Sequence, residues 1–203
     1  MGDMIANLLV NLSGALIFLF IFWKKLKEDH ASEIIFSSAY TVLAGILAGY
    51  LVSRNFFPEW FFWSEVVGII VGYVISIYKF RVRVFETLDS LVISLLPWLS
   101  LTFLKDSVAN SSLISFISFV VVLLFIFIYH FLDMRYKRFT WYRSGKIGFS
   151  GLATLTLFFI TRAAIATSFG AVLSFVSIYE PYISGVLAFA VALIIFNLSR
   201  KEE

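Results

Sequence analysis

One cationic side chain stands out because it lies inside an apolar stretch: Arg162, which follows Gly148 by fourteen residues. A helix rises about 1.5 Å per residue, so Arg162 would lie roughly 21 Å from the start of a helix that begins at Gly148. A buried arginine costs at least about 2.5 to 3.5 kcal/mol on insertion scales, and it therefore needs a partner or a path to water. Its planar guanidinium can grip a phosphate through two hydrogen bonds, so Arg162 is a candidate lipid phosphate-binding residue. Two other interpretations remain open, in which the side chain extends to the outer surface or is neutralised by a carboxylate of the protein.

Glu65 is the natural candidate for that carboxylate, since it lies near the outer end of another apolar segment. If the two side chains pair, Arg162 is less available to a phosphate and a structural role is favoured. The alternative is that Glu65 faces the water around lipid headgroups. Ser64 and Glu65 are the candidate supporting residues of a site around Arg162, and no residue is assigned a catalytic role.

The composition indicates where these residues must be placed. Of the 203 residues, 61% are hydrophobic and only 14% are charged, whereas a soluble domain has about half apolar and a quarter charged residues. Alternating barrel strands would dilute the apolar runs with polar residues, so a helical membrane protein is predicted. The chain has no Cys, which excludes a thiolate nucleophile or a thiolate metal site.

A membrane-spanning helix needs about 20 mostly apolar residues. The sequence predicts an all-α polytopic membrane helix bundle of seven transmembrane helices, in a single domain over residues 1–203. The segment from 163 to 178 either extends the sixth span or forms a separate interfacial helix. The predicted spans are 4–23, 34–53, 60–78, 87–104, 111–132, 148–168 and 182–198.

The basic residues assign an orientation to these spans. Thirteen of the 16 Lys and Arg residues fall on one side of the predicted membrane, Arg54 and Lys105 fall on the other, and Arg162 lies within a span. The positive-inside rule then predicts an outside N-terminus and a cytoplasmic C-terminus. The net charge of +3 is therefore interpreted as a topology signal, with no nucleic-acid partner expected.

Three further features have simple structural interpretations. Asp89 begins the fourth span, where a carboxylate in the first helical turn is favoured by the helix dipole. The pairs Gly45 with Gly49 and Gly68 with Gly72 have the small-xxx-small spacing that allows two helices to approach closely. The two histidines, His30 and His130, lack a second ligand at metal spacing, so no metal and no other cofactor is expected.

Four segments together resemble the prolipoprotein diacylglyceryl transferase family, whose members have seven spans and an outside N-terminus. The similarity covers most of the chain, and the order and spacing of the segments carry it rather than any single motif. Gly148 and Arg162 stand at the family's Gly-to-Arg separation. The segments read FWKKLKEDHASEIIFSSAY, FFWSEVVGIIVGYVIS, YKFRVRVFETLDSLVISLLP and YRSGKIGFSGLATLTLFFITR.

The sequence departs from the family at most of its polar positions. Trp63, Ser64 and Glu65 stand where the family has a His-Gly-Gly motif, and Ala166 replaces the Glu expected one turn after the late arginine. The family's Arg-Ile-Gly-Asn stretch is absent from 101–112. The chain is thus similar to a divergent member that lacks the His-Gly-Gly motif.

The resemblance implies one function, and two alternative functions remain open. It implies transfer of a diacylglyceryl group from phosphatidylglycerol to a lipobox cysteine, with phospholipid and a prolipoprotein signal peptide as partners, in the bacterial inner (plasma) membrane. The first alternative is a noncatalytic lipid-binding or scaffold protein of the same fold. The second is a small transporter, which requires a continuous polar path across the membrane.

Overall fold

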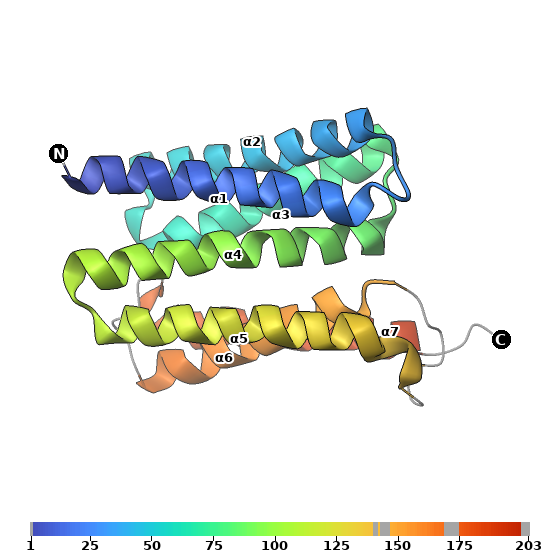
Figure 1. The fold of residues 1–203 in the computed structure, drawn as a ribbon. Coiled ribbons are helices and arrows are strands. Elements are labelled where there is room, and N and C mark those ends of the chain that lie inside the picture. The colour runs from blue at the N-terminus through green and yellow to red at the C-terminus, as the bar shows by residue number, and fades with distance from the viewer. Residues whose placement is uncertain (1, 140–141, 143–146, 169–174, 200–203) are drawn as a thin grey trace.

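The computed structural model describes residues 2–139, 142, 147–168 and 175–199 (Figure 1). Within these residues the chain forms seven helices long and apolar enough to span a membrane, which confirms the predicted helical bundle. Three short 3-10 helices connect them, at Pro58–Trp60, Tyr136–Arg138 and Ser177–Tyr179. The long helices are α1 (Gly2–Leu26), α2 (Ser32–Phe56), α3 (Phe61–Phe80), α4 (Val84–Asn110), α5 (Leu113–Arg135), α6 (Phe149–Ser168) and α7 (Glu180–Ser199).

Each observed helix contains most or all of one predicted span, and the differences lie at the ends. The helix α4 extends from Val84 to Asn110, so it begins earlier and ends later than the predicted 87–104. Helical hydrogen bonding continues past the apolar run, because polar residues of a terminal turn can face water at the membrane surface. For the segment 163–178 the prediction left two choices. Its first residues, 163–168, belong to α6, which ends at Ser168, and residues 169–174 lie outside the described residues.

The helices form two groups joined by α4. Figure 1 shows α1, α2 and α3 on one side of α4, with α5, α6 and α7 on the other. The helix α4 contacts α1, α5 and α6 most, whereas α2 packs chiefly on α3, and α6 packs chiefly on α7. The start of α1 and the end of α7 lie at opposite ends of the bundle (Figure 1), as an odd number of spans requires. The contacts between the two groups of helices therefore run mainly through α4.

The apolar side chains divide between the interior and the outer surface. One buried cluster includes Phe18, Phe22 and Val42 in the first group of helices. A second includes Phe125 and Phe158 in the other group. Many large apolar side chains are also exposed, which is unfavourable in water but is the expected surface of a protein in a bilayer.

Glycines bring α2 and α3 into backbone contact, which confirms the close packing predicted from their spacing. A Cβ atom added at Gly45 would lie 2.1 Å from the carbonyl oxygen of Gly68, and one at Gly68 would lie 2.1 Å from that of Gly45. A Cβ atom at Gly49 would lie 2.3 Å from the carbonyl oxygen of Ser64. A methyl group has no room at these positions, so the glycines set the distance between the two helices.

We expect Gly68→Ala to lower the free energy of unfolding by about 1–3 kcal/mol, because the added methyl group forces the α2 and α3 backbones apart. Gly185→Ala is the matched control, since a Cβ atom at Gly185 meets nothing within 4 Å. Unfolding in SDS, followed by tryptophan fluorescence, measures both changes. Equal stabilities of the two variants would contradict the close packing of α2 on α3.

Candidate functional site

Arg162 lies inside the bundle and pairs with a carboxylate of α7. Its residue is only 5% exposed. Its Nη2 atom lies 2.7 Å from Oε1 of Glu180, and its Nε atom donates a hydrogen bond of 2.9 Å to the same oxygen. A buried charge of this kind is stable only when it is paired and hydrogen-bonded. The structure thus gives Arg162 an anionic partner within the protein.

Glu180 is fully buried and accepts hydrogen bonds from three other groups. Its Oε2 atom accepts from Nε1 of Trp63 at 2.9 Å and from the backbone nitrogen of Val176 at 3.3 Å. Its Oε1 atom also accepts from Oγ of Ser184 at 2.9 Å. Glu180 is the first residue of α7, where the helix dipole favours a negative charge. The carboxylate thereby connects α3, α6 and α7.

Aromatic rings enclose the guanidinium group of Arg162. The Cζ atom lies 3.7 Å from the centre of the Phe62 ring and 4.9 Å from that of Phe175. Trp63 stacks on Phe159 with ring centres 6.0 Å apart. Ring faces attract a cation and exclude water. This environment suits a buried structural ion pair, and contact between Arg162 and a lipid phosphate stays a prediction.

The prediction that Glu65 is the partner of Arg162 is wrong, because Glu180 occupies that position. Among the described residues, neither Ser64 nor Glu65 forms an ion pair or a side-chain hydrogen bond with Arg162, whose partner there is Glu180. The sequence does not single out Glu180 as a partner, because Glu180 precedes the predicted last span, 182–198. Its place at the outer end of that span, at a depth similar to that of Arg162, was the available signal.

A lateral groove lies on the other side of Trp63, between α2, α3 and α7. Its volume is about 500 Å³, and almost all of its lining is apolar. The glycines Gly45, Gly49 and Gly68 line it, and among the described lining residues Ser64 supplies the one hydroxyl group. Trp63 therefore faces the groove and also donates its indole hydrogen bond to Glu180. The Arg162–Glu180 pair holds one wall of this groove in place.

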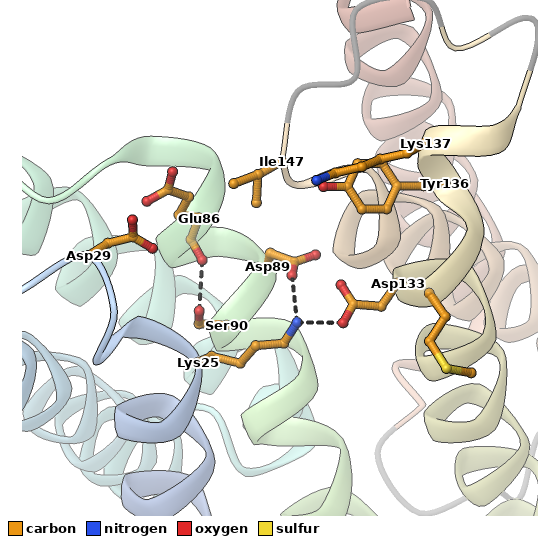
Figure 2. A pocket seen from close by; sticks show the side chains of 10 residues that line it. Lys25, Asp29, Glu86, Asp89, Ser90, Asp133, Tyr136, Lys137 and Ile147 are labelled. Atoms are coloured by element: carbon orange, nitrogen blue, oxygen red, sulfur yellow. Dashed lines mark hydrogen bonds and ion pairs between the residues drawn. The ribbon is translucent and has the colours of Figure 1, made fainter.

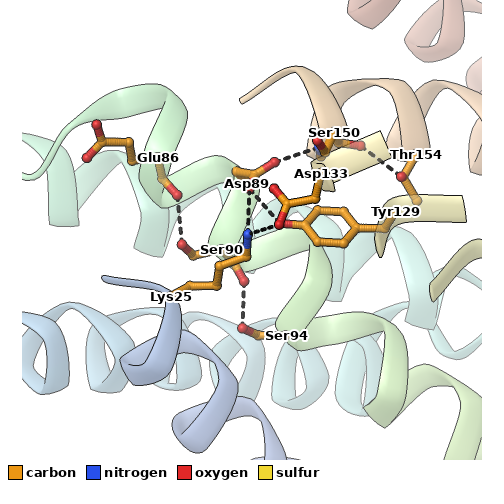
Figure 3. Close-up of polar contacts among 10 residues, drawn as sticks. Lys25, Glu86, Asp89, Ser90, Ser94, Tyr129, Asp133, Ser150 and Thr154 are labelled. Atoms are coloured by element: carbon orange, nitrogen blue, oxygen red, sulfur yellow. Dashed lines mark hydrogen bonds and ion pairs between the residues drawn. The ribbon is translucent and has the colours of Figure 1, made fainter. Parts of the chain in front are cut away.

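A second polar cluster lies at the opposite end of the bundle, on the side that the basic residues assign to the cytoplasm. Figure 3 shows Asp89 of α4 facing Tyr129 of α5 and Lys25 of α1. Its Oδ2 atom accepts a hydrogen bond of 2.5 Å from the Tyr129 hydroxyl, and Oδ1 accepts one of 2.6 Å from the backbone nitrogen of Gly151. Nζ of Lys25 lies 3.6 Å from Oδ2. Asp89 thus joins four helices.

The interpretation of Asp89 as a first-turn residue is corrected by this geometry. The helix α4 begins at Val84, which places Asp89 in the second turn, where its carboxylate points into the bundle. Gly151 allows the close approach, because a Cβ atom there would lie 2.8 Å from the Asp89 Cα atom. The sequence offers two signals, an aspartate in an otherwise uncharged span and a glycine in another span.

The comparisons with known proteins add no relative. No family model, curated protein or solved structure matches the chain. Among the described residues, no group of three His, Asp or Glu side chains could hold a metal ion. The function must therefore be argued from the groove and the two polar clusters.

Proposed function

We propose that the protein binds a membrane phospholipid, with one acyl chain in the lateral groove between α2, α3 and α7. The observation that carries the proposal is the groove itself, a hollow of about 500 Å³ whose lining is almost wholly apolar and which lies beside the close contact of α2 with α3. Phosphatidylglycerol is the lipid to test first, because the sequence resembles a family that uses it. The bacterial inner membrane is the proposed location on the same ground.

The ends of the groove fit the polar and apolar parts of a lipid. Trp60 lies at the outer end, and tryptophan favours the level of the headgroups. Ser64 follows about one turn later, where its hydroxyl can donate a hydrogen bond to an ester carbonyl group. Val67 and Val71 continue along α3 toward the centre of the bilayer, beside the path of the chain.

Binding without transfer is the function that the geometry supports best. Diacylglyceryl transfer needs cations around the leaving phosphate and a group that takes a proton from the thiol. The guanidinium of Arg162 faces Glu180. Among the described residues, the polar side chains that line the groove are Ser64 and the two tryptophans Trp60 and Trp63. None of these is a base, so the proposed function ends at lipid binding.

Native mass spectrometry of the purified protein tests the proposal. We expect the wild-type protein to retain a bound phospholipid and Val67→Trp to lose most of it, because the indole fills the groove. Val186→Trp is the control, since Val186 of α7 is 68% exposed and does not line the groove. Equal lipid retention by Val67→Trp and the wild type would overturn the proposal.

A transfer assay with phosphatidylglycerol and a lipobox peptide separates a binding protein from an enzyme. The expected result is no diacylglyceryl peptide under conditions in which a member of the transferase family forms it. A product whose formation is lost in Arg162→Ala, in protein that remains folded, would instead establish the transferase function.

A further inference from the structure

A cavity of about 380 Å³ opens beside the Asp89 cluster, at the end of the bundle opposite the outer end of the lipid groove. It lies where α1, α4 and α5 meet, and Figure 2 shows Lys25 extending between Asp89 and Asp133. The charged side chains in its lining are Lys25, Asp29, Glu86, Asp89, Asp133 and Lys137. Four carboxylates thus face two lysines, and Arg83 outside the lining contacts Asp29 and Glu86, so an excess of one negative charge remains among the described residues.

Part of this charge is neutralised within the protein. Nζ of Lys25 donates a hydrogen bond of 2.8 Å to Oδ2 of Asp133 and lies 3.6 Å from Oδ2 of Asp89. Asp89 also accepts from the Tyr129 hydroxyl and the Gly151 backbone, as described above. These contacts fix one wall of the cavity, and the other wall holds the carboxylates of Asp29 and Glu86.

The other wall contains an acceptor with no donor. Oε1 of Glu86 accepts a hydrogen bond of 2.8 Å from Nη1 of Arg83. The second oxygen, Oε2, is buried and has no hydrogen-bond partner in the part of the chain that the structure describes. Asp29 lies on the same wall, with Oδ1 3.5 Å from the shared Nη1 atom of Arg83. Since buried polar groups are almost always hydrogen-bonded, this oxygen indicates an absent donor.

We propose that the cavity binds a primary ammonium group, which donates a hydrogen bond to Oε2 of Glu86. An ammonium group carries a positive charge and three N–H donors, so it can satisfy this oxygen and also face Asp29. A metal ion is a poorer fit, because no group of three His, Asp or Glu side chains among the described residues could hold one. The proposal does not depend on the lipid groove.

A primary ammonium group has two sources at a membrane surface, a lipid headgroup such as phosphatidylethanolamine or a free polyamine. Two binding experiments distinguish them. The first compares native mass spectra of the full-length protein from nanodiscs that contain phosphatidylethanolamine or phosphatidylcholine, whose quaternary nitrogen has no N–H donor. The second measures spermidine binding to the detergent-purified protein by titration calorimetry.

The variant Glu86→Gln tests the contact, because it removes the negative charge while keeping the size of the side chain. We expect Glu86→Gln to weaken binding about tenfold or more in whichever of the two experiments detects binding, because the variant loses a hydrogen bond between charged groups. Glu33→Gln is the matched control, since Glu33 is an exposed carboxylate in the first turn of α2 at the same end of the bundle. Tryptophan fluorescence verifies that both variants are folded.

Each outcome decides the proposal. Retention of phosphatidylethanolamine over phosphatidylcholine that Glu86→Gln abolishes identifies a lipid headgroup. Spermidine binding that Glu86→Gln weakens identifies a free amine. Absence of both, or ammonium binding that is equal in Glu86→Gln and Glu33→Gln, overturns the proposal.

Discussion

Glu180→Ala should destabilise the protein by about 3–5 kcal/mol, the cost of removing one partner from a buried ion pair. The variant removes the carboxylate whose Oε1 atom lies 2.7 Å from Nη2 of Arg162. The guanidinium of Arg162 then stays inside the bundle without an anionic partner. It also removes the acceptor for the Trp63 indole. SDS unfolding of the purified protein measures the loss of stability.

A double variant separates a structural role of the pair from a lipid-binding role. Replacing both charged residues by leucine removes the desolvation cost together with the attraction, so Arg162→Leu with Glu180→Leu should recover most of the lost stability. If Arg162 were held mainly by a lipid phosphate, Glu180→Ala would change the stability little. That result would contradict a structural ion pair.

Asp89→Ala has the second large expected effect, a loss of roughly 2–5 kcal/mol. The change removes the Asp89 carboxylate, which accepts hydrogen bonds from the Gly151 backbone nitrogen and the Tyr129 hydroxyl. Each buried polar group that loses its partner costs about 1–3 kcal/mol. The loss of packing between α4, α5 and α6 should appear in the same SDS unfolding measurement.

Asp133→Asn serves as the control for Asp89→Ala, because Asp133 belongs to the same cluster. Its side chain is 32% exposed and its main contact is the ion pair with Lys25. Ion pairs near the surface contribute about 1 kcal/mol or less. A loss in Asp133→Asn as large as in Asp89→Ala would show that the lysine, and not the Gly151 and Tyr129 contacts, stabilises the cluster.

The sequence predicted the membrane helices well, because their signal is local. A run of about 20 apolar residues identifies a span without any knowledge of its neighbours. The glycine pairs on α2 and α3 were also predicted, since a four-residue spacing places both members on one face of a helix. Gly45 and Gly68 do meet, at the distance that only glycine permits.

The partners of the charged residues were not predicted, because they depend on how each helix is rotated about its axis. Glu65 and Glu180 both lie near the outer ends of their spans, and depth alone does not separate them as partners of Arg162. Successive residues of a helix are about 100° apart, so rotation decides which carboxylate faces the guanidinium. The polar residues are too few to show a periodic pattern that would fix this rotation.

The most direct test of lipid binding is the position of the lipid itself. A phospholipid with a photoreactive group in one acyl chain can be incorporated into membranes that contain the protein, and the cross-linked residues identified by peptide mass spectrometry. We expect the adducts to concentrate on Val67, Val71 and Ile183, which line the groove. Adducts spread evenly over the lipid-facing surfaces of all helices, with no excess at these three residues, would contradict a lipid bound in the groove.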